Sequence, residues 1–323
     1  MIKILPDVSK QIRSKEILNI FKKNYSEIVP VWVPMQTQWM NTLYKTFNDY
    51  DKFMIIIHLL LKTFDFYSKN FVKLNYQEFF DQSKVEIKEI NIIEISNFLN
   101  MPKETARRKV IELEKLGVIK RIKKKIIIDR ETWPSIKPED TMIRMSRFLS
   151  VVSKILYKEK LISESLTSDQ IITTFKENFS YIWKLYFEIQ IPMLLGFKKI
   201  YGDFETFHVH GICLGNQFLN AKKNNTKMSK EYFIEKYFTD DKKSFTGINA
   251  MSISDISGIP RATVMRKLDK LIKEKFLTKN NKKQYLVRSL HINKLSRVQK
   301  TTFINLSIFA ECVYNLCLFK KNN

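Results

Sequence analysis

Arginine and lysine side chains gather on one side of a segment that has the periodicity of a helix. In the segment from Lys103 to Lys115, the apolar residues Ala106, Val110 and Leu113 recur at the spacing of one helix face. The opposite side carries Lys103, Glu104, Thr105, Arg107 and Arg108. Such a face suits contact with DNA bases, because the N-terminal end of a DNA-reading helix is the part that enters the major groove.

The same arrangement occurs a second time, in the segment GIPRATVMRKLDKL that begins at Gly258. Here Val264, Leu268 and Leu271 form the apolar side. The outward side carries Arg261, Ala262, Thr263, Met265 and Arg266. A proline opens each of the two helices, where its fixed φ fits the first turn. A shorter helix and a turn precede each proline, so we expect two helix-turn-helix segments, at about residues 92–117 and 252–275.

Each of these segments is followed by apolar, β-forming residues on both sides of a basic turn. The two stretches are GVIKRIKKKIIID, in a wing of about residues 118–129, and FLTKNNKKQYLV, in a wing of about residues 276–288. Residues 103–125 hold ten Lys or Arg and three Glu, and residues 261–283 hold nine Lys or Arg and two acidic residues. Each window therefore carries a net charge of +7, and together they supply 14 of the 23 net charges.

The chain is an internal repeat. Residues 95–115 align with residues 253–273 without a gap, and eight pairs are identical. Further matches follow the same order: residues 8–28 with 162–182, 31–35 with 189–193, 47–53 with 201–207, and 149–157 with 306–314. We therefore expect two copies of one domain, at residues 1–158 and 159–323, which pack about a pseudo-two-fold axis as a homodimer does.

Each copy is expected to be mostly helical. Ser14 and Ser168 are predicted N-caps of a first helix, and Pro30 and Pro34 are expected to end it. An apolar helix is expected around residues 51–67, and long C-terminal helices at about residues 139–157 and 296–318. The stretch from Val72 to Asn91 shows no clear pattern.

Composition narrows the class of function. A net charge of +23 on a chain with 44% hydrophobic residues indicates a soluble protein that meets nucleic acid or an anionic membrane. The longest apolar run, FMIIIHLLL, is too short to span a bilayer. The N-terminus lacks a signal-peptide pattern, and the three cysteines fit reduced thiols, so we expect a cytoplasmic protein. No motif of a catalytic site appears, which argues against an enzyme.

The short motif HVHGIC brings His208, His210 and Cys213 close together in the chain. On a helix, only His210 and Cys213 share a face, and two ligands do not make a zinc site. We therefore expect ordinary packing here and no metal or other cofactor.

The segment IPRATVMRKLDKLIKEKFL resembles the turn and recognition helix of MarR-like and IclR-like winged helix-turn-helix transcription regulators. The resemblance implies a mainly α fold with small β-wings, two tandem winged helix-turn-helix domains, and long helices that build a dimer-like interface. It also implies that these residues face DNA bases: Lys103, Glu104, Thr105, Arg107, Arg108, Arg261, Thr263, Met265 and Arg266. Arginine can bond guanine O6 and N7 together, and a methionine can touch a thymine methyl group.

A second set of basic residues is expected to bind phosphates and set the register on DNA. These residues are Lys109, Lys120, Arg121, Lys123, Lys124, Lys125, Lys267, Lys279, Lys282 and Lys283.

The predicted function is a transcription regulator that reads double-stranded DNA with two recognition helices of one chain. Since KETARR and RATVMR differ, the target is expected to be an imperfect inverted repeat. Affinity should fall steeply with salt. One alternative is a plasmid or phage replication initiator, which would bind direct repeats. Another is a winged-helix scaffold that binds protein. No residue pattern identifies a small-molecule effector or further self-association.

Overall fold

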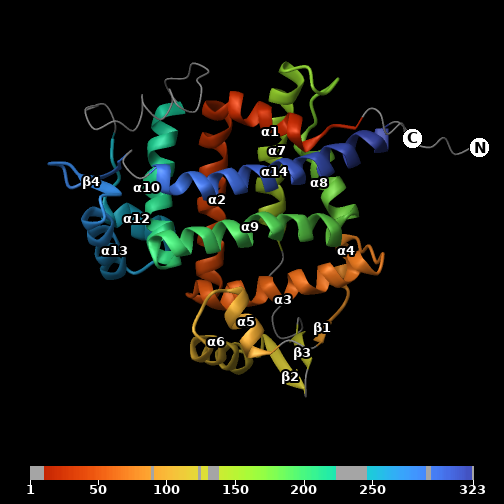
Figure 1. Ribbon diagram of the computed structural model, residues 1–323, viewed down its shortest axis with the longest axis horizontal. Coiled ribbons are helices and arrows are strands. Elements are labelled where there is room, and N and C mark those ends of the chain that lie inside the picture. Colours follow the sequence, from red (N-terminus) through yellow and green to blue (C-terminus); the bar gives the residue numbers. More distant parts are fainter. Residues whose placement is uncertain are drawn as a thin grey trace, which may run out of the picture.

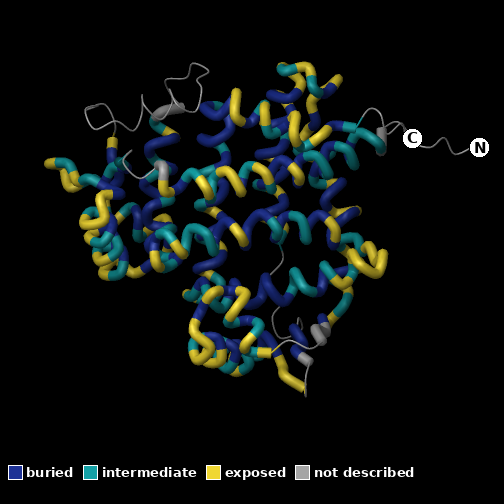
Figure 2. Tube along the Cα trace, viewed as in Figure 1, coloured by how far each residue is buried: buried dark blue, intermediate teal, exposed yellow. Residues whose placement is uncertain are grey.

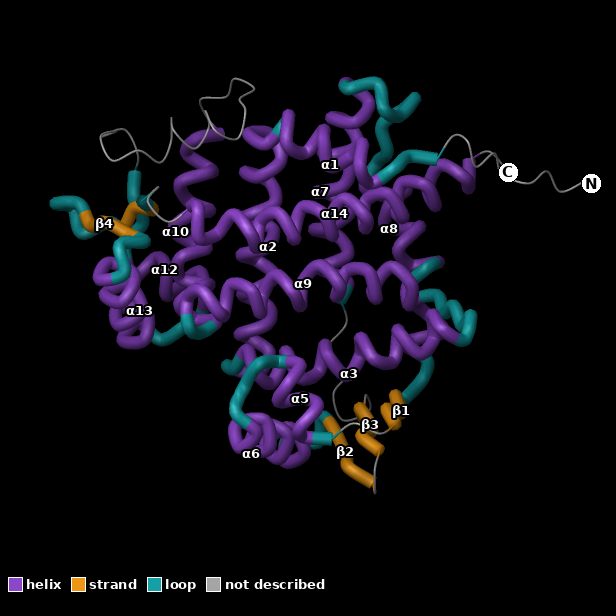
Figure 3. The backbone as a smooth tube through the Cα atoms, viewed as in Figure 1, coloured by secondary structure: helices purple, strands orange, loops and turns teal. Residues whose placement is uncertain are grey.

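The computed structural model describes residues 11–88, 91–122, 125–129, 138–222, 246–288 and 292–321. These residues form a mainly helical protein with two small antiparallel sheets, as the sequence predicts (Figures 1 and 3). The two sheets lie at separate edges of the helical body (Figure 3).

Apart from α4 and β1, which have no counterpart among the described residues of the second half, the helices and strands follow the same order in the two halves. The first half contains α1 (Ser14–Lys23), α2 (Tyr25–Phe47), α3 (Tyr50–Lys69), α4 (Tyr76–Phe80), β1 (Lys84–Lys88), α5 (Ile92–Phe98), α6 (Lys103–Lys115), β2 (Ile119–Ile122), β3 (Lys125–Asp129) and α7 (Glu139–Lys158). The second half contains α8 (Ser168–Glu177), α9 (Phe179–Tyr201), α10 (Phe204–Lys222), α12 (Ala250–Ser257), α13 (Arg261–Lys273), β4 (Leu277–Lys279), β5 (Tyr285–Val287) and α14 (Ile292–Lys321).

The start points of these elements keep two constant separations. Helices α8, α9 and α10 each begin 154 positions after α1, α2 and α3, and α12 and α13 begin 158 positions after α5 and α6. The change of four positions therefore falls between α10 and α12. The predicted match of residues 31–35 with 189–193 uses a separation of 158 inside α2 and α9, where the common separation is 154. That match is wrong by one helical turn.

Two local expectations about the first helices are also wrong. Pro30 and Pro34 lie inside α2 and do not end a helix. Packing overrides the proline signal, because the neighbouring residues Trp32, Met35 and Trp39 are buried and hold the helix together.

The predicted N-caps of α1 and α8 are each displaced by one residue. Ser14 and Ser168 are the first helical residues, and the caps are Arg13 and Thr167. Thr167 forms a capping box with Gln170, in which the hydroxyl oxygen accepts from the Gln170 amide at 3.2 Å. The Ser14 amide donates to the carboxylate of Glu311 in α14 at 2.6 Å, so a side chain from the other half caps this end.

The first sheet has the strand order β1-β3-β2, and the second pairs β4 with β5. All of these pairs are antiparallel. Strand β1 comes from the stretch for which the sequence gives no clear pattern. In the second half, an isolated antiparallel bridge joins Ile248 to Tyr285 of β5, beside the two-stranded hairpin.

Contacts between the two halves are reciprocal. Helix α2 packs on α10, and its counterpart α9 packs on α3; likewise α1 packs on α14, and α8 on α7 (Figure 1). The rings of Trp39 and Tyr186 meet edge to face at 5.8 Å, and those of Phe21 and Phe303 at 6.0 Å. Buried residues of both halves thus form one continuous hydrophobic core.

Gln36 of α2 and Gln190 of α9 form a buried amide pair between the halves. Gln36 Nε2 donates to Gln190 Oε1 at 2.6 Å, and Gln190 Nε2 donates to Gln36 Oε1 at 3.2 Å. The two residues occupy equivalent positions, because they are 154 positions apart like the helices that carry them.

Within the described residues, one helical segment is long and apolar enough to cross a membrane. This segment is Lys294–Phe319 of α14, with a mean hydropathy of 1.5, and 44% of its apolar window is buried inside the protein. This segment is longer than the apolar run of residues 53–61 that stands out in the sequence. Helix α14 packs against α1, α8 and α9, which explains its apolar face as part of the shared core.

The amide pair generates a prediction about stability. Gln36→Leu leaves the buried Gln190 amide, which also bonds the Tyr186 hydroxyl, without its Gln36 partner, so we expect it to lower the free energy of unfolding by about 1–3 kcal/mol. Gln36→Leu/Gln190→Leu removes both amides and should recover part of this loss, because only the bond from Gln190 to the Tyr186 hydroxyl remains unreplaced. Urea denaturation followed by circular dichroism measures each change.

Gln38→Leu is the matched control, because Gln38 lies on the same helix and is exposed. It should change stability by no more than about 0.5 kcal/mol. With Gln190→Leu measured as the second single variant, a double variant whose loss equals the sum of the two single losses would show that the glutamines do not act as a pair.

Candidate nucleic-acid interface

A tight turn joins α5 to α6, and an equivalent turn joins α12 to α13. Asn100 and Gly258, which are 158 positions apart, have positive φ values of 47° and 74°. Glycine and asparagine are the residues that adopt this left-handed conformation most readily. The Ser96 hydroxyl donates to the Met101 carbonyl at 2.7 Å, and the Ser254 hydroxyl donates to the Ile259 carbonyl at 2.7 Å. The same bonds therefore shape both turns.

One face of α6 and one face of α13 are buried, as their periodicity predicts. Ala106, Val110 and Leu113 are fully buried on α6, and so are Val264, Leu268 and Leu271 on α13. Helix α6 packs on α5 and α3, and α13 packs on α12 and α10. Each helix thus presents only its other face to solvent (Figure 2).

Most residues predicted to face DNA bases are exposed on that other face. The exposed members of the set are Lys103, Glu104, Arg107, Arg108, Arg261 and Arg266. Thr105, Thr263 and Met265 are half-buried. The sulfur of Met265 lies 4.0 Å from the Tyr285 hydroxyl of β5, so this side chain leans toward the hairpin.

The exposed arginines of α6 make only long ion pairs. Arg107 lies 3.8 Å from Glu104, and Arg108 lies 3.7 Å from Glu112, with guanidinium side chains 61% and 65% exposed. Surface pairs of this kind contribute little free energy. Both guanidinium groups can therefore exchange their carboxylate partner for an anionic ligand at small cost.

Lys109 and Lys267 do not lie where phosphate binding requires them. Both are on the inner side of their helices and only 14% and 13% exposed. Lys109 forms an ion pair with Asp49, and Lys267 forms one with Asp203 at 2.8 Å. Since each ammonium group already has a carboxylate partner inside the protein, the prediction that these two lysines bind phosphate does not fit their geometry.

The two ion pairs are equivalent, and each connects a basic helix to the end of a helical hairpin. Asn48 and Gly202 end α2 and α9 in positive-φ conformations, with φ values of 52° and 87°. The next residues, Asp49 and Asp203, stand at the start of α3 and α10. Asp49 accepts from the amides of Asp51 and Lys52, and Asp203 accepts from the amide and hydroxyl of Thr206. Each aspartate therefore caps the N-terminus of one helix and forms an ion pair with a lysine of another helix.

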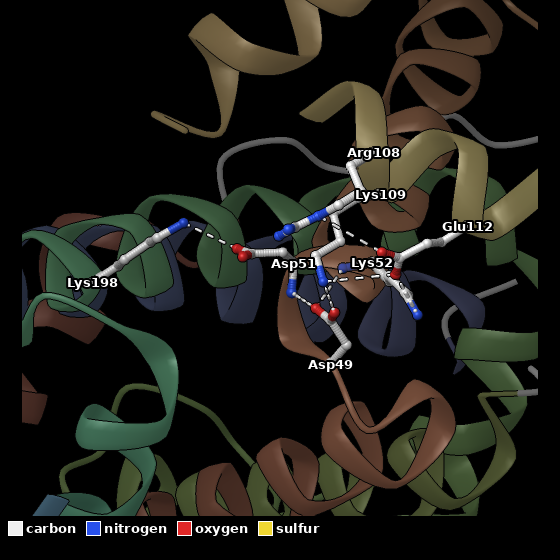
Figure 4. A network of polar contacts seen from close by, with 7 residues as sticks. All are labelled: Asp49, Asp51, Lys52, Arg108, Lys109, Glu112 and Lys198. Carbon is white, nitrogen blue, oxygen red and sulfur yellow. Dashed lines mark hydrogen bonds and ion pairs between the residues drawn. The ribbon is translucent and has the colours of Figure 1, made fainter. Parts of the chain in front are cut away.

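A network of charges surrounds the Asp49 pair (Figure 4). The carboxylate of Glu112 in α6 forms an ion pair with the ammonium group of Lys52 in α3 at 2.8 Å. The ammonium group of Lys109 lies 3.7 Å from the same carboxylate. The bond from Lys52 is the main reason that the pKa of Glu112 is lowered. On the far side, Asp51 pairs with Lys198 of α9 at 3.0 Å. The network thus joins the basic helix α6 to helices from both halves.

In the second half, two lysines of α13 converge on the α9–α10 junction. Lys270 donates to the Tyr201 carbonyl at 2.5 Å and lies 3.9 Å from the Asp203 carboxylate. A Cβ at Gly202 would stand 2.9 Å from the Lys270 nitrogen, so a larger residue would crowd this approach. Burial raises the pKa of Asp203, but the bonds from Lys267 and Thr206 outweigh this effect, and the net pKa lies below its ordinary value.

The hairpin of the second half presents its turn lysines to solvent. The Asn280 side chain accepts from the amides of Lys282 and Gln284 at 3.0 and 2.9 Å, which fixes the turn. Lys282 and Lys283 are exposed, and the ammonium group of Lys279 lies 5.5 Å above the Tyr285 ring. These three lysines fit the predicted phosphate-binding set.

The hairpin of the first half is braced by two ion pairs. Lys120 bonds Asp129 at 2.7 Å, and Arg121 bonds both carboxylate oxygens of Glu114 at 2.7 and 2.5 Å. Both basic side chains remain more than a third exposed. Lys123 and Lys124 lie outside the described residues, as does the side chain of Lys125 at the start of β3.

Four residues that hold the basic helices in place were not predicted from the sequence, namely Asp49, Asp203, Lys52 and Lys270. The repeat held a signal for the two aspartates, since both fall in the matched segments FNDYDKF and YGDFETF. Their partners, Lys109 and Lys267, are one of the eight identical pairs.

The motif HVHGIC lies in α10 and packs in the core. His208 bonds the Tyr50 hydroxyl at 2.5 Å, and His210 bonds the Tyr201 hydroxyl at 2.8 Å, each through Nδ1. Burial raises the pKa of the Cys213 thiol to about 12, which keeps it protonated. Across the described ranges, no cluster of three or more His, Cys, Asp or Glu residues is arranged to hold a metal ion.

Comparison with known proteins identifies no relative: no family model, no curated protein and no solved structure matches this chain.

The Asp203 pair generates a prediction about pH. Asp203→Asn keeps the helix cap but removes the charge, so we expect about 1 kcal/mol lower stability at pH 7, a fall of a few degrees in melting temperature. Since the pKa of Asp203 is lower in the folded state than in the unfolded state, its contribution is present at neutral pH and is lost in acid. The gap between the two proteins should stay constant from pH 7 to about 5 and narrow below that.

Asp269→Asn is the control, because Asp269 is an exposed carboxylate on the same helix as Lys267. It should leave the melting temperature almost unchanged at every pH. A gap for Asp203→Asn that stays constant down to pH 3.5 would show that the carboxylate charge does not stabilise the fold.

Proposed function

We propose that this protein binds double-stranded DNA in a sequence-specific way, as a transcription regulator with two winged helix-turn-helix units in one chain. The observation that carries the proposal is the duplicated surface. In each half, a helix with a buried inner face presents exposed arginines outward and is followed by a basic hairpin. We assign the protein to the cytoplasm and give it no catalytic role.

The roles of the elements follow from winged-helix geometry. Helices α6 and α13 enter the major groove with their N-terminal ends, where Arg107, Arg108, Arg261 and Arg266 are exposed. Guanidinium groups in this position bond guanine edges. Lys279, Lys282 and Lys283 of the second hairpin bind phosphates and set the register. In the first half, Lys120 and Arg121 take this role.

The relation between the halves favours an inverted repeat as the target. Reciprocal packing of α2 on α10 and of α9 on α3, with the Gln36–Gln190 pair between them, supports a pseudo-two-fold axis. Two reading helices related by such an axis meet DNA half-sites of opposite direction. A replication initiator that binds direct repeats requires its two units in the same direction, which this packing disfavours.

The two half-sites are expected to differ. Position 107 is arginine in α6, and the equivalent position in α13 is Met265, which leans toward the hairpin. Position 104 is glutamate in α6, and its equivalent is Ala262. Only the arginine pair Arg108 and Arg266 and the threonine pair Thr105 and Thr263 are identical among the outward residues. The shared residues predict a common element in both half-sites, with different bases around it.

Arg266 offers the sharpest test of this assignment. We expect Arg266→Ala to weaken binding to a target duplex by about 1–3 kcal/mol and to relax the preference at one base pair. Binding is measured by fluorescence anisotropy with the target and with duplexes that carry each single base change.

Arg147→Ala is the matched control, since Arg147 is an exposed arginine on α7, outside the helix pairs. It should retain the affinity and the base preference of the unmodified protein. An unchanged preference for Arg266→Ala would contradict the placement of α13 in the groove. Absence of DNA binding at physiological salt would favour a protein-binding scaffold instead.

A further inference from the structure

A histidine is buried where the first basic unit meets the helical scaffold. This unit consists of α5, α6 and the sheet of β1, β3 and β2, and it packs on α3 through α6 and β1 (Figure 1). His58 of α3 is 2% exposed, and its imidazole stacks on the ring of Phe98 in α5, with ring centroids 3.8 Å apart and planes at 22°. The Phe98 ring is itself 38% exposed. The imidazole thus lies between the scaffold and the unit, against a ring that is open to solvent.

Neither nitrogen of the His58 imidazole has a hydrogen-bond partner among the described residues. A neutral imidazole carries one N–H donor and one acceptor, so both groups are unsatisfied while α5 rests on α3. A buried polar group without a partner costs free energy. The two nitrogens therefore weaken the contact that the ring stack provides.

The second half fills the same place with aliphatic side chains. The equivalent of His58, 154 positions later in α10, is Ile212, which is 3% exposed. The equivalent of Phe98, 158 positions later in α12, is Ile256. An isoleucine leaves no polar atom unsatisfied, and α12 packs on both α10 and α2. The fold therefore does not require a histidine here, and His58 distinguishes the attachment of the first unit from that of the second.

Burial opposes a positive charge on His58 and lowers its pKa to about 4. Two nearby charges have smaller and opposite effects, since Glu94 of α5 raises the pKa and Lys62 of α3 lowers it. These two side chains form an ion pair with each other. The carboxylate that faces His58 from α5 is thus already held by a lysine, and the buried imidazole is neutral at pH 7.

The other elements packed on α3 bring charged groups that have ion pairs of their own or are exposed. Those of α6 are Lys109 and Glu112, paired with Asp49 and Lys52; those of α9 are Lys184 and Lys198, paired with Asp65 and Asp51; Lys45 of α2 and Lys84 of β1 are exposed. None of these pairs supplies a spare carboxylate to a protonated imidazole at position 58.

We propose that His58 makes the attachment of the first basic unit to α3 sensitive to pH. When α5 moves away from α3, water reaches the imidazole, which then has its ordinary pKa of roughly 6.5. The buried imidazole takes up a proton only at lower pH, so acid favours the open position. The attachment has its full stability above about pH 6.5 and loses stability as the pH falls toward about 4.

Two other histidines are buried, but in a different setting. His208 and His210 of α10 each bond a tyrosine hydroxyl inside the shared core, at 2.5 and 2.8 Å. Their exposure requires that the core itself opens. A measurement that resolves local opening therefore separates His58 from these two residues.

Hydrogen exchange of the full chain, resolved by peptide with mass spectrometry and corrected for the intrinsic effect of pH, provides this measurement. We expect the protection of α5 and α6 to fall about tenfold between pH 7.5 and pH 5.5, and that of α12 and α13 to stay constant. Unchanged protection of α5 and α6 would overturn the proposal. An equal loss in both basic units would also overturn it, because it would indicate that acid loosens the whole fold.

Two substitutions separate titration from packing. His58→Ile introduces the residue of the second half, and His58→Gln keeps a polar side chain that does not titrate. We expect the protection of α5 and α6 to be the same at both pH values in each variant, and to be higher in His58→Ile than in the unmodified protein at pH 7.5. If one variant does not fold, the other decides.

Glu94→Gln is the control for carboxylate titration, and it should retain the loss of protection in acid. A tenfold loss that persists in His58→Ile or in His58→Gln would show that another group is responsible. Abolition of the loss in Glu94→Gln would contradict the proposal as well.

The consequence for DNA rests on the proposed function, whereas the opening of the first unit does not. Opening releases α6 from its position relative to α13, and the apparent Kd rises as the attached fraction falls. We expect the affinity of the unmodified protein for a target duplex to fall below that of His58→Ile at pH 5.5. Equal affinities, with the exchange effect present, would overturn this consequence alone. Sequence-specific binding without the exchange effect would overturn the role of His58 and leave the proposed function intact.

Discussion

One ion pair, which occurs once in each half, connects each basic helix to the helical scaffold. In the first half, Asp49 at the start of α3 forms an ion pair with Lys109 of α6. In the second half, Asp203 at the start of α10 forms the equivalent pair with Lys267 of α13. The aspartate also accepts bonds from backbone amides of its own helix, so its position is fixed by local structure. The pair, together with the buried apolar face of the basic helix, leaves the exposed arginines on the solvent side.

The residue before each aspartate makes this arrangement feasible. Asn48 and Gly202 have positive φ and turn the chain sharply, so that one scaffold helix ends and the next begins within two residues. In the second half, the missing side chain of Gly202 also leaves room for Lys270 to reach the Tyr201 carbonyl. The same geometry is thus reached with asparagine in one half and glycine in the other, the two residues that tolerate it best.

The shared core determines how the two basic units lie relative to each other. Helices of each half pack on helices of the other half, and one hydrophobic cluster includes residues from both. The relative placement of α6 and α13 is therefore set by core packing rather than by a linker. In the proposed function, this rigidity fixes the separation of the two half-sites.

Much of this organisation could be predicted from the sequence, because its signals are local or repeated. The periodicity of Ala106, Val110 and Leu113 identifies a buried helix face, and the duplicate at Val264, Leu268 and Leu271 supports it. The constant separation of elements follows from the repeat, apart from the misplaced match around Pro34 and Pro192. The prediction that Pro30 and Pro34 end a helix was wrong, because tertiary packing stabilises α2 across two residues that normally break a helix.

The candidate site was predicted less completely, for a physical reason. Lysines on a basic helix look alike in sequence, but Lys109 and Lys267 turn inward because an aspartate from a distant helix junction meets them. Such a pairing depends on how α6 packs on α3 and α13 on α10, which no local pattern encodes.

The central claim is that one chain holds two DNA-reading helices in a fixed two-fold relation. The most direct test is selection of bound duplexes from a random DNA pool at physiological salt, followed by sequencing. The account predicts an enriched inverted repeat with two unequal half-sites whose centres lie about ten base pairs, or roughly 34 Å, apart. Enrichment of direct repeats would contradict the two-fold relation, and the absence of any enriched sequence would contradict specific DNA reading.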